Sequence, residues 1–133
     1  MTDQMLTIDI PKTEWMSSNG REHRMDHARR TAALRAGAAV LSSRQLHAVG
    51  GAVLVAVTCR HRGGTAPDVD GCAPAVKAVI DGMTDAGIWP DDNAGWVKAI
   101  CYMRPRKDKR LPVGWHGLDL RLIDQCISWM EEE

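Results

Sequence analysis

Two short acidic motifs have the residue types and spacing that are best suited to chemistry. The first is Asp68 with Asp70, directly before a segment of helical periodicity, and the second is Asp91 with Asp92, after that segment and a glycine turn. In an extended segment, carboxylates two residues apart point to the same side. If the two motifs meet in the fold, three or four carboxylates share one site. A hard divalent cation, Mg²⁺ or Mn²⁺, would then remove their mutual repulsion.

A divalent cation held in this way suits phosphodiester hydrolysis, because it stabilises the attacking and leaving oxygens. Lys77, in the first turns of the expected helix, can offset phosphate charge or steady a carboxylate. Ordinary structural roles compete with this interpretation. The first motif also suits a turn or an N-cap, the second suits a solvated turn, and Lys77 with Asp81 suits an i,i+4 ion pair. The residues alone leave both interpretations open.

The charges of the chain are segregated, although 17 Lys+Arg balance 17 Asp+Glu. Residues 21–62 hold eight Arg and two acids, residues 66–92 hold six Asp and one Lys, and residues 104–110 hold five basic residues and one Asp. Basic surface attracts polyanions, whereas an acidic centre repels phosphate unless a cation is bound there. The segment 104–110 is therefore either a solvated loop or a grip on a phosphate backbone.

Other kinds of site are weakly supported. The four Cys residues form no C-x-x-C pair, and His23 with His27 lacks further zinc ligands close by. Glycine-rich nucleotide loops are absent. The first ten residues carry two acids and no basic stretch, and no apolar run approaches the roughly 18 residues of a membrane span. We therefore expect a cytoplasmic protein with reduced thiols and no membrane partner.

Four strands are predicted to carry the sheet that positions these residues. The apolar patterns that indicate them cover residues 6–10, 52–59, 96–103 and 116–123. The second is a continuous Val-rich run, which suits a strand buried on both faces. In the fourth, alternate leucines at 118, 120 and 122 suit a half-buried strand.

Two helices are predicted between the strands, over residues 26–45 and 73–86, and a short third helix is expected within 124–133. Asp26 suits the N-cap of the first helix. The order of elements indicates a single α/β or α+β domain over residues 1–133, with a mixed sheet and packed helices. The apolar stripes comprise Ala33, Gly37, Val40 and Leu41 in the first helix and Val76, Val79, Ile80 and Met83 in the second.

The segment 68–92 resembles the RusA family of Holliday junction resolvases. The family pattern is D-x-D-N, a lysine, D-[AG]-L, a glycine turn and D-D. Residues 18–23 resemble the family's S-N-x-R-x-H type of motif. One departure is Gly71, which stands where the family has Asn and cannot hydrogen-bond a carboxylate or the substrate. The matching residues are Asp68, Asp70, Lys77, Asp81, Gly82, Gly87, Asp91 and Asp92.

The resemblance implies a small α/β homodimer, often encoded by a phage or prophage, that cuts four-way DNA junctions by paired nicks with Mg²⁺ or Mn²⁺. It implies that Asp68, Asp70 and Asp92 bind metal and act in catalysis. Asp91 would assist as a further ligand, and Lys77 would be the catalytic or phosphate-contacting lysine. With the two basic flanks, it predicts DNA contacts from Asn19, Arg21, His23, Arg24, Arg104, Arg106, Lys107, Lys109 and Arg110.

Gly71 keeps an alternative function open, a branched-DNA-binding protein of the same fold without nuclease activity. A further alternative is a structural domain whose acids serve only in turns and caps.

Overall fold

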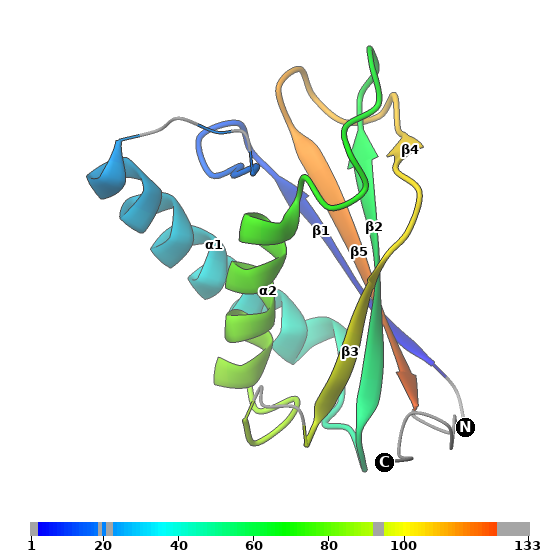
Figure 1. The fold of residues 1–133 in the computed structure, drawn as a ribbon. Coiled ribbons are helices and arrows are strands. Elements are labelled where there is room, and N and C mark those ends of the chain that lie inside the picture. The colour runs from blue at the N-terminus through cyan, green and yellow to red at the C-terminus, as the bar shows by residue number, and fades with distance from the viewer. Residues whose placement is uncertain (1–2, 19, 21–22, 92–94, 125–133) are drawn as a thin grey trace.

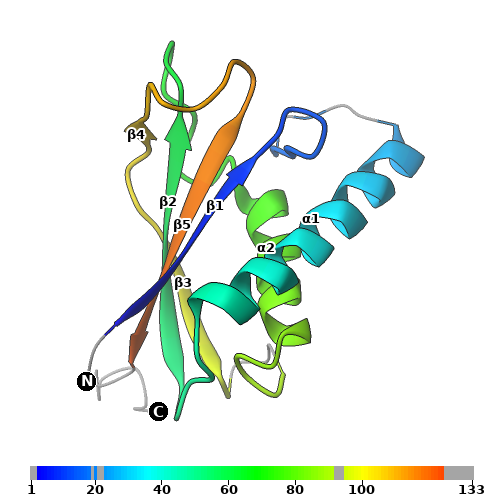
Figure 2. The ribbon, with the colours of Figure 1, turned by 180° about the vertical axis from the view of Figure 1, so that it is seen from behind.

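In the described part of the chain, five strands form one mixed sheet and two helices pack against one of its faces (Figures 1 and 2). The structure is a computed structural model that describes residues 3–18, 20, 23–91 and 95–124. This architecture confirms the predicted α+β class, with a mixed sheet and packed helices. The elements are, in chain order, β1 (Gln4–Ile10), α1 (Arg24–Gln45), β2 (Val53–His61), α2 (Ala73–Asp85), β3 (Val97–Tyr102), β4 (Arg106–Lys107) and β5 (His116–Asp124).

The order of the strands is β1-β5-β2-β3, and the short β4 pairs with the end of β2. Although β5 comes last in the chain, it lies between β1 and β2 and is antiparallel to both. The strands β3 and β4 run parallel to β2. Because parallel neighbours cannot be joined by a tight hairpin, α2 forms the crossover from the end of β2 to the start of β3. The crossover therefore places the start of α2 near the end of β2 and the end of α2 near the start of β3.

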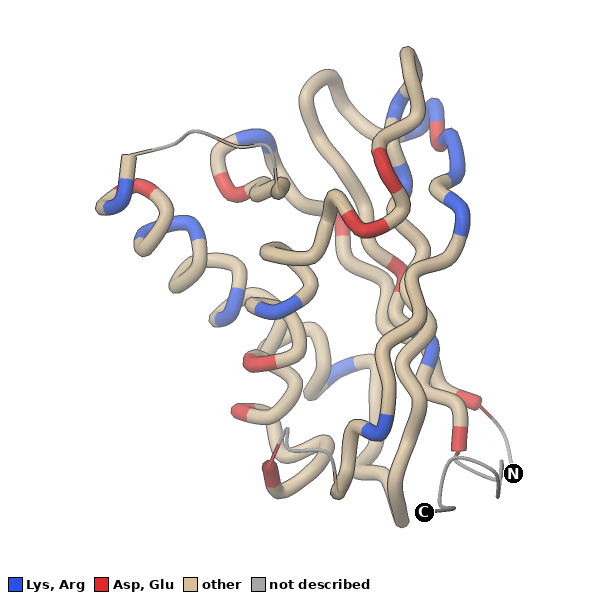
Figure 3. Tube along the Cα trace, viewed as in Figure 1, with Lys and Arg blue, Asp and Glu red and all other residues tan. Residues whose placement is uncertain are grey.

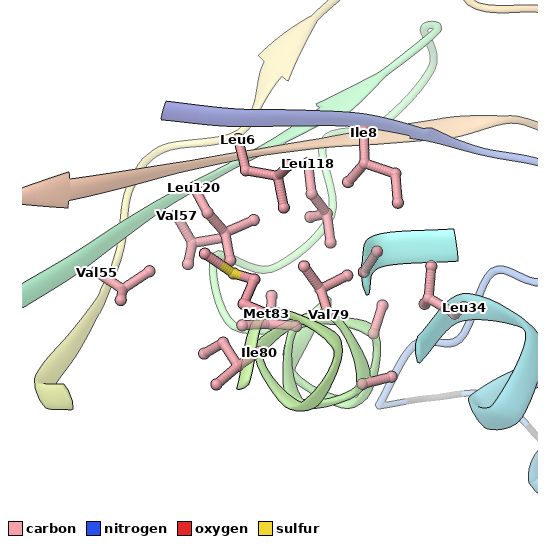
Figure 4. Close-up of a cluster of buried hydrophobic side chains, with 14 of the residues drawn as sticks. Leu6, Ile8, Leu34, Val55, Val57, Val79, Ile80, Met83, Leu118 and Leu120 are labelled. Carbon is pink, nitrogen blue, oxygen red and sulfur yellow. The ribbon is translucent and has the colours of Figure 1, made fainter. Parts of the chain in front are cut away.

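The core lies between the helices and the face of the sheet that they cover. Figure 4 shows side chains of β1, β2 and β5 directed toward α2, with Leu34 of α1 beside them. The alternation of β5 and the apolar stripe of α2 are confirmed, because their predicted members are all buried. These are Leu118, Leu120 and Leu122 in β5 and Val76, Val79, Ile80 and Met83 in α2.

The other face of the sheet carries neither α1 nor α2 (Figures 1 and 2). Along β2, Val53, Val55 and Val57 are buried, whereas the residues between them, Leu54 and Ala56, are only partly buried. The prediction that this strand is buried on both faces was therefore wrong. The apolar run arises because one face of the strand is buried and the other face also carries small or aliphatic residues.

The beginning of α1 differs from the prediction. Its N-cap is His23, whose Nδ1 accepts a hydrogen bond from the Met25 amide at 3.2 Å. Asp26 lies within the first turn instead, where its carboxylate pairs with Arg29 and Arg30 at 2.6 Å each. The helix therefore begins before Asp26, and the acid contributes charge pairing rather than a cap.

The buried face of α1 also differs from the predicted stripe. Leu34, Ala38 and Ser42 are the buried residues of this helix, whereas Gly37 and Val40 are exposed. The predicted stripe was therefore rotated from the true one. An Ala-rich helix offers little contrast between its faces, so its orientation depends on the partner helix.

Two further differences from the prediction lie in the second half of the chain. The basic segment contains a short strand, β4, that the sequence did not predict. The short helix expected within 124–133 is not seen at its first residue, because β5 continues through Asp124, and residues 125–133 lie outside the described residues. Among the described residues, neither helix has the length and hydropathy that crossing a membrane requires.

The helices α1 and α2 approach closely at Gly82. A Cβ at this position would lie 2.8 Å from the Ala38 Cβ and 3.0 Å from the Ala39 amide nitrogen. Next to this contact, the Arg35 guanidinium binds the Asp85 carboxylate through two hydrogen bonds of 2.6 and 2.8 Å. Backbone packing at the glycine therefore sets the separation of the helices.

We predict that Gly82→Ala lowers the free energy of unfolding by about 1–3 kcal/mol, because the added methyl group forces the helices apart. Urea denaturation would measure the change. The matched control is Gly37→Ala in α1, where an added Cβ meets nothing within 4 Å. The control should raise stability by up to about 1 kcal/mol through helix propensity. Equal effects of the two substitutions would contradict the packing argument.

Candidate functional site

Asp68 and Asp70 lie on a turn between the end of β2 and the start of α2, here called the acidic turn (residues 68–71). The Gly71 amide donates to the Asp68 carbonyl, and the Ala73 amide donates to the Asp70 carbonyl, both at 3.0 Å. The segment is therefore curled, and the extended geometry that would point both carboxylates to the same side is not observed. Neither acid caps α2, since the N-cap residue is Cys72 and no side chain caps the helix.

Both carboxylates of the acidic turn are available to a ligand. Asp68 and Asp70 are exposed, and within the described residues neither side chain forms a hydrogen bond or an ion pair. An added Cβ at Gly71 would lie 3.2 Å from the Asp68 carbonyl oxygen. A side chain at this position would therefore crowd the backbone of the turn.

The N-terminal motif reaches the acidic turn through its first residue. The Ser18 amide donates to the Gly71 carbonyl at 2.8 Å, and the Ser18 hydroxyl lies 3.5 Å from the Asp70 carbonyl. The fold thus joins two motifs that are far apart in the chain. His23 and Arg24 are exposed at the start of α1. Asn19 and Arg21 lie outside the described residues.

The second acidic motif does not meet the first. Asp91 follows α2, whose 13 residues span about 20 Å at 1.5 Å per residue. The first motif precedes the same helix, so Asp91 lies at its opposite end. The prediction that Asp91 joins Asp68 and Asp70 in one cluster was therefore wrong. Asp92 lies outside the described residues. Within the described part, no three His, Cys, Asp or Glu side chains are grouped to hold a metal.

Lys77 lies in the second turn of α2, close after the acidic turn. Its side chain is exposed, and among the described residues it forms no ion pair with Asp81 or any other acid. The ordinary interpretation of these two residues as an i,i+4 pair is therefore not observed. The ammonium group is available to a bound anion.

Tyr102, at the end of β3, completes the surroundings of the acidic turn. Burial is the main cause that raises the pKa of the Tyr102 phenol, and the charges of Cys72 and Asp70 raise it further. The Asp70 carboxylate therefore acts electrostatically on this side chain. Sequence analysis did not find Tyr102, and the available signal was that it is the only Tyr in the chain.

Two buried thiols lie beneath the acidic turn. Cys59 of β2 and Cys72 at the start of α2 interact through their side chains, and this contact and burial raise the pKa of Cys59. The same contact lowers the pKa of Cys72, because a thiol hydrogen bond stabilises the thiolate form. The pair links the end of β2 to the first turn of α2.

A cavity of about 760 Å³ opens beside the acidic turn and is here called the basic cavity. Its lining combines the end of β2, the following loop and the segment 104–110, here called the basic loop. Ala66, on the rim, precedes Asp68 by only two residues. In Figure 3 the blue residues of the basic loop follow the side of the molecule at β4. The lining includes His61, Gly64, Ala66, Arg104, Arg106 and Lys107.

The cations of the basic loop differ in how they are paired. Arg104, Lys107 and Lys109 are exposed and form no ion pair within the described residues. Arg106 lies 3.3 Å from the Asp119 carboxylate, and Arg110 lies 3.3 Å from Asp108. Two of these unpaired cations, Arg104 and Lys107, line the basic cavity, and their positive charges favour a bound anion there.

A buried ion cluster fixes the basic loop to the sheet. The Arg60 guanidinium is 5% exposed and binds Asp9 at 2.7 Å, Asp108 at 2.8 Å and Asp119 at 3.0 Å. Asp108 belongs to the basic loop, and its amide also donates to the His61 carbonyl at 2.7 Å. Burial lowers the pKa of Arg60, but the bonded carboxylates outweigh this effect and raise the pKa above its usual value.

Sequence analysis missed this cluster, although two signals were present. Arg60 directly follows an apolar strand, and Asp108 is the only acid among the basic residues of the loop. Charged residues in such places usually have a buried partner. Their partners come from distant strands, so the pairing itself requires the fold.

No protein-family model matches the chain, and no curated protein matches it. The functional interpretation therefore depends on the residues and their placement.

We predict that Arg60→Met lowers the free energy of unfolding by about 3–5 kcal/mol at neutral pH, because it leaves buried carboxylates without their cation. Arg60 holds the pKa of Asp108 below its usual 3.8. This contribution is present at neutral pH and is lost as the pH falls through the lowered pKa. The difference in the free energy of unfolding between the variant and the wild type should therefore become smaller at acidic pH.

Denaturation in urea at a series of pH values would measure this effect. The control is Arg121→Met, which removes an exposed guanidinium from the neighbouring strand β5 and should change stability by less than about 0.5 kcal/mol. A similar loss in both variants, or a difference that does not vary with pH, would count against the ion cluster.

Proposed function

We propose that this chain is a metal-dependent endodeoxyribonuclease of the RusA type that resolves four-way DNA by paired phosphodiester nicks. One observation carries the proposal. Two exposed carboxylates, without side-chain partners in the described structure, follow Ala66 by a few residues, and Ala66 lines a cavity together with the unpaired cations Arg104 and Lys107. Such a surface offers ligands to a hard cation and binding groups to phosphates in one place.

Asp68 and Asp70 fit a Mg²⁺ ion, for which Mn²⁺ can substitute. Magnesium in phosphate-processing sites is held by one or two carboxylates, while water and substrate oxygens complete its coordination. The exposure of both carboxylates and their lack of side-chain partners in the described structure meet this need. When bound, the ion would stabilise the attacking and leaving oxygens. The proposed ligands in the described part of the chain are therefore Asp68 and Asp70.

Lys77 supports the same chemistry from α2. Its ammonium group, which has no ion pair in the described structure, lies close after the acidic turn and offsets the charge of a phosphate that approaches Asp68 and Asp70. The lysine thereby favours binding of an anion beside two acids. This is the role that the resemblance to RusA resolvases implies for it.

DNA is the substrate that suits the distribution of positive charge. Arg104, Lys107 and Lys109 on one flank, with His23 and Arg24 on the other, contact phosphates of different duplex arms. A four-way junction is two-fold symmetric, so a homodimer provides one site for each nicked strand. Such an enzyme acts in recombination, repair or phage DNA processing, in the cytoplasm of a bacterial or phage-infected cell.

A second candidate function is branched-DNA binding without cleavage. It is favoured by Gly71, which replaces the Asn of the family pattern, and by the lack of a three-acid cluster in the described residues. Both candidate functions require the basic flanks. They differ only in whether the acidic turn supports hydrolysis.

We predict that Asp70→Asn reduces cleavage of a four-way junction by about 100-fold or more, because it removes a negatively charged metal ligand. Stability and junction affinity should change little, since the Asp70 side chain has no hydrogen-bond partner among the described residues. Cleavage of an end-labelled junction would be compared in Mg²⁺, Mn²⁺ and EDTA, beside binding in EDTA.

Asp3→Asn, which also neutralises an exposed carboxylate, is the matched control and should cut normally. A linear duplex of the same sequence tests junction specificity. If the wild-type protein binds the junction without cutting in either metal, the second candidate function holds. If a folded Asp70→Asn variant loses binding as well, the acidic turn is not the metal site.

A further inference from the structure

A second cavity, of about 350 Å³, lies between α2 and β3. It begins at Ala73, directly after the acidic turn, and is here called the apolar cavity. Aliphatic side chains of both elements form its walls, including Ile100, which is 40% exposed. Its functional groups are few. They are the phenol ring of Tyr102, the ammonium group of Lys77 and the carboxylate of Asp81.

These groups have the chemistry that recognises a nucleobase. A base has flat faces, which stack on aromatic rings and aliphatic side chains, and an edge with hydrogen-bond donors and acceptors. Lys77 can donate to a ring nitrogen or carbonyl, and Asp81 can accept from an exocyclic amine. Because these two side chains form no ion pair with each other in the described structure, both are available.

The position of the cavity fits a base of the strand that is cut. Asp70 acts electrostatically on Tyr102, and Lys77 lines the cavity while lying close to the acidic turn. A phosphate bound at Asp68 and Asp70 therefore has the cavity beside it. In branched DNA, bases at the crossover leave the stack at a lower cost than bases within a duplex.

We propose that the apolar cavity binds an unstacked nucleobase of the DNA strand held at the acidic turn, with Tyr102 as its stacking platform. The inference rests on the proposed function for its substrate. It adds a base-recognition site that the basic flanks cannot provide, because phosphate contacts carry no sequence information. Asp81 then favours bases with an exocyclic amine over those without one.

The test uses four-way junctions with 2-aminopurine placed, one position at a time, around the crossover. Fluorescence and affinity are measured in EDTA, so that cleavage is not needed. We expect one position at which binding raises the emission about two-fold or more, because the base leaves its stack. Tyr102→Ala should abolish this increase and weaken binding by about 5- to 100-fold. Tyr102→Phe, which keeps the ring, should retain both.

The matched control is Met103→Ala, which truncates the neighbouring exposed side chain. Met103 directly follows β3, and it lines a separate cavity with Ala56 and Arg121 rather than the apolar cavity. Circular dichroism and thermal unfolding confirm that each variant is folded. As a second variant, Asp81→Asn should reduce the difference in affinity between junctions with cytosine or adenine and junctions with thymine at the responsive position.

The outcomes separate this inference from the proposed nuclease. Normal metal-dependent cutting without a responsive position would overturn the base site alone. A responsive position that needs the Tyr102 ring, in a protein that does not cut, would support the base site and overturn the nuclease. Loss of self-association in Tyr102→Ala, with the fluorescence increase unchanged, would assign the cavity to a second copy of the chain and overturn the inference.

Discussion

The arrangement of the candidate functional site depends on the buried guanidinium of Arg60. One cation from β2 holds carboxylates from β1, from the basic loop and from β5. An isolated guanidinium at this depth would be costly, and the three partners offset that cost. Gly117 of β5 is part of the same arrangement, because an added Cβ there would collide with the guanidinium. Asp108 is therefore an anchor within a loop of cations that otherwise repel one another.

This anchor explains how a chain of zero net charge presents separate regions of opposite sign. The basic loop is fixed where β2 ends, and the acidic turn follows β2 a few residues later. The basic loop lines the basic cavity together with Ala66, which lies two residues before the acidic turn. The charges that hold the basic loop in this position, at Arg60 and Asp108, are paired and buried. The exposed charges of the loop and the turn are left to act on ligands.

The elements that the sequence predicted well are those with strong periodic contrast. Alternate leucines identified β5, and the stripe from Val76 to Met83 identified the buried face of α2. In the Ala-rich α1 the contrast is weak, so the buried face was misplaced. The one-sided burial of β2 depends on which face the helices cover, which no local pattern encodes. The separation of Asp91 from Asp68 follows from the parallel crossover, in which α2 keeps its two ends apart.

The same separation limits which residues of the candidate site can act together. Asp68, Asp70, Lys77 and Tyr102 are brought together by the start of α2 and the end of β3, whatever the position of the second acidic motif. Within this group the two acids have no side-chain partners in the described structure, so they add little to folding. Both side chains are therefore left for the ligand that the proposed function assigns to them.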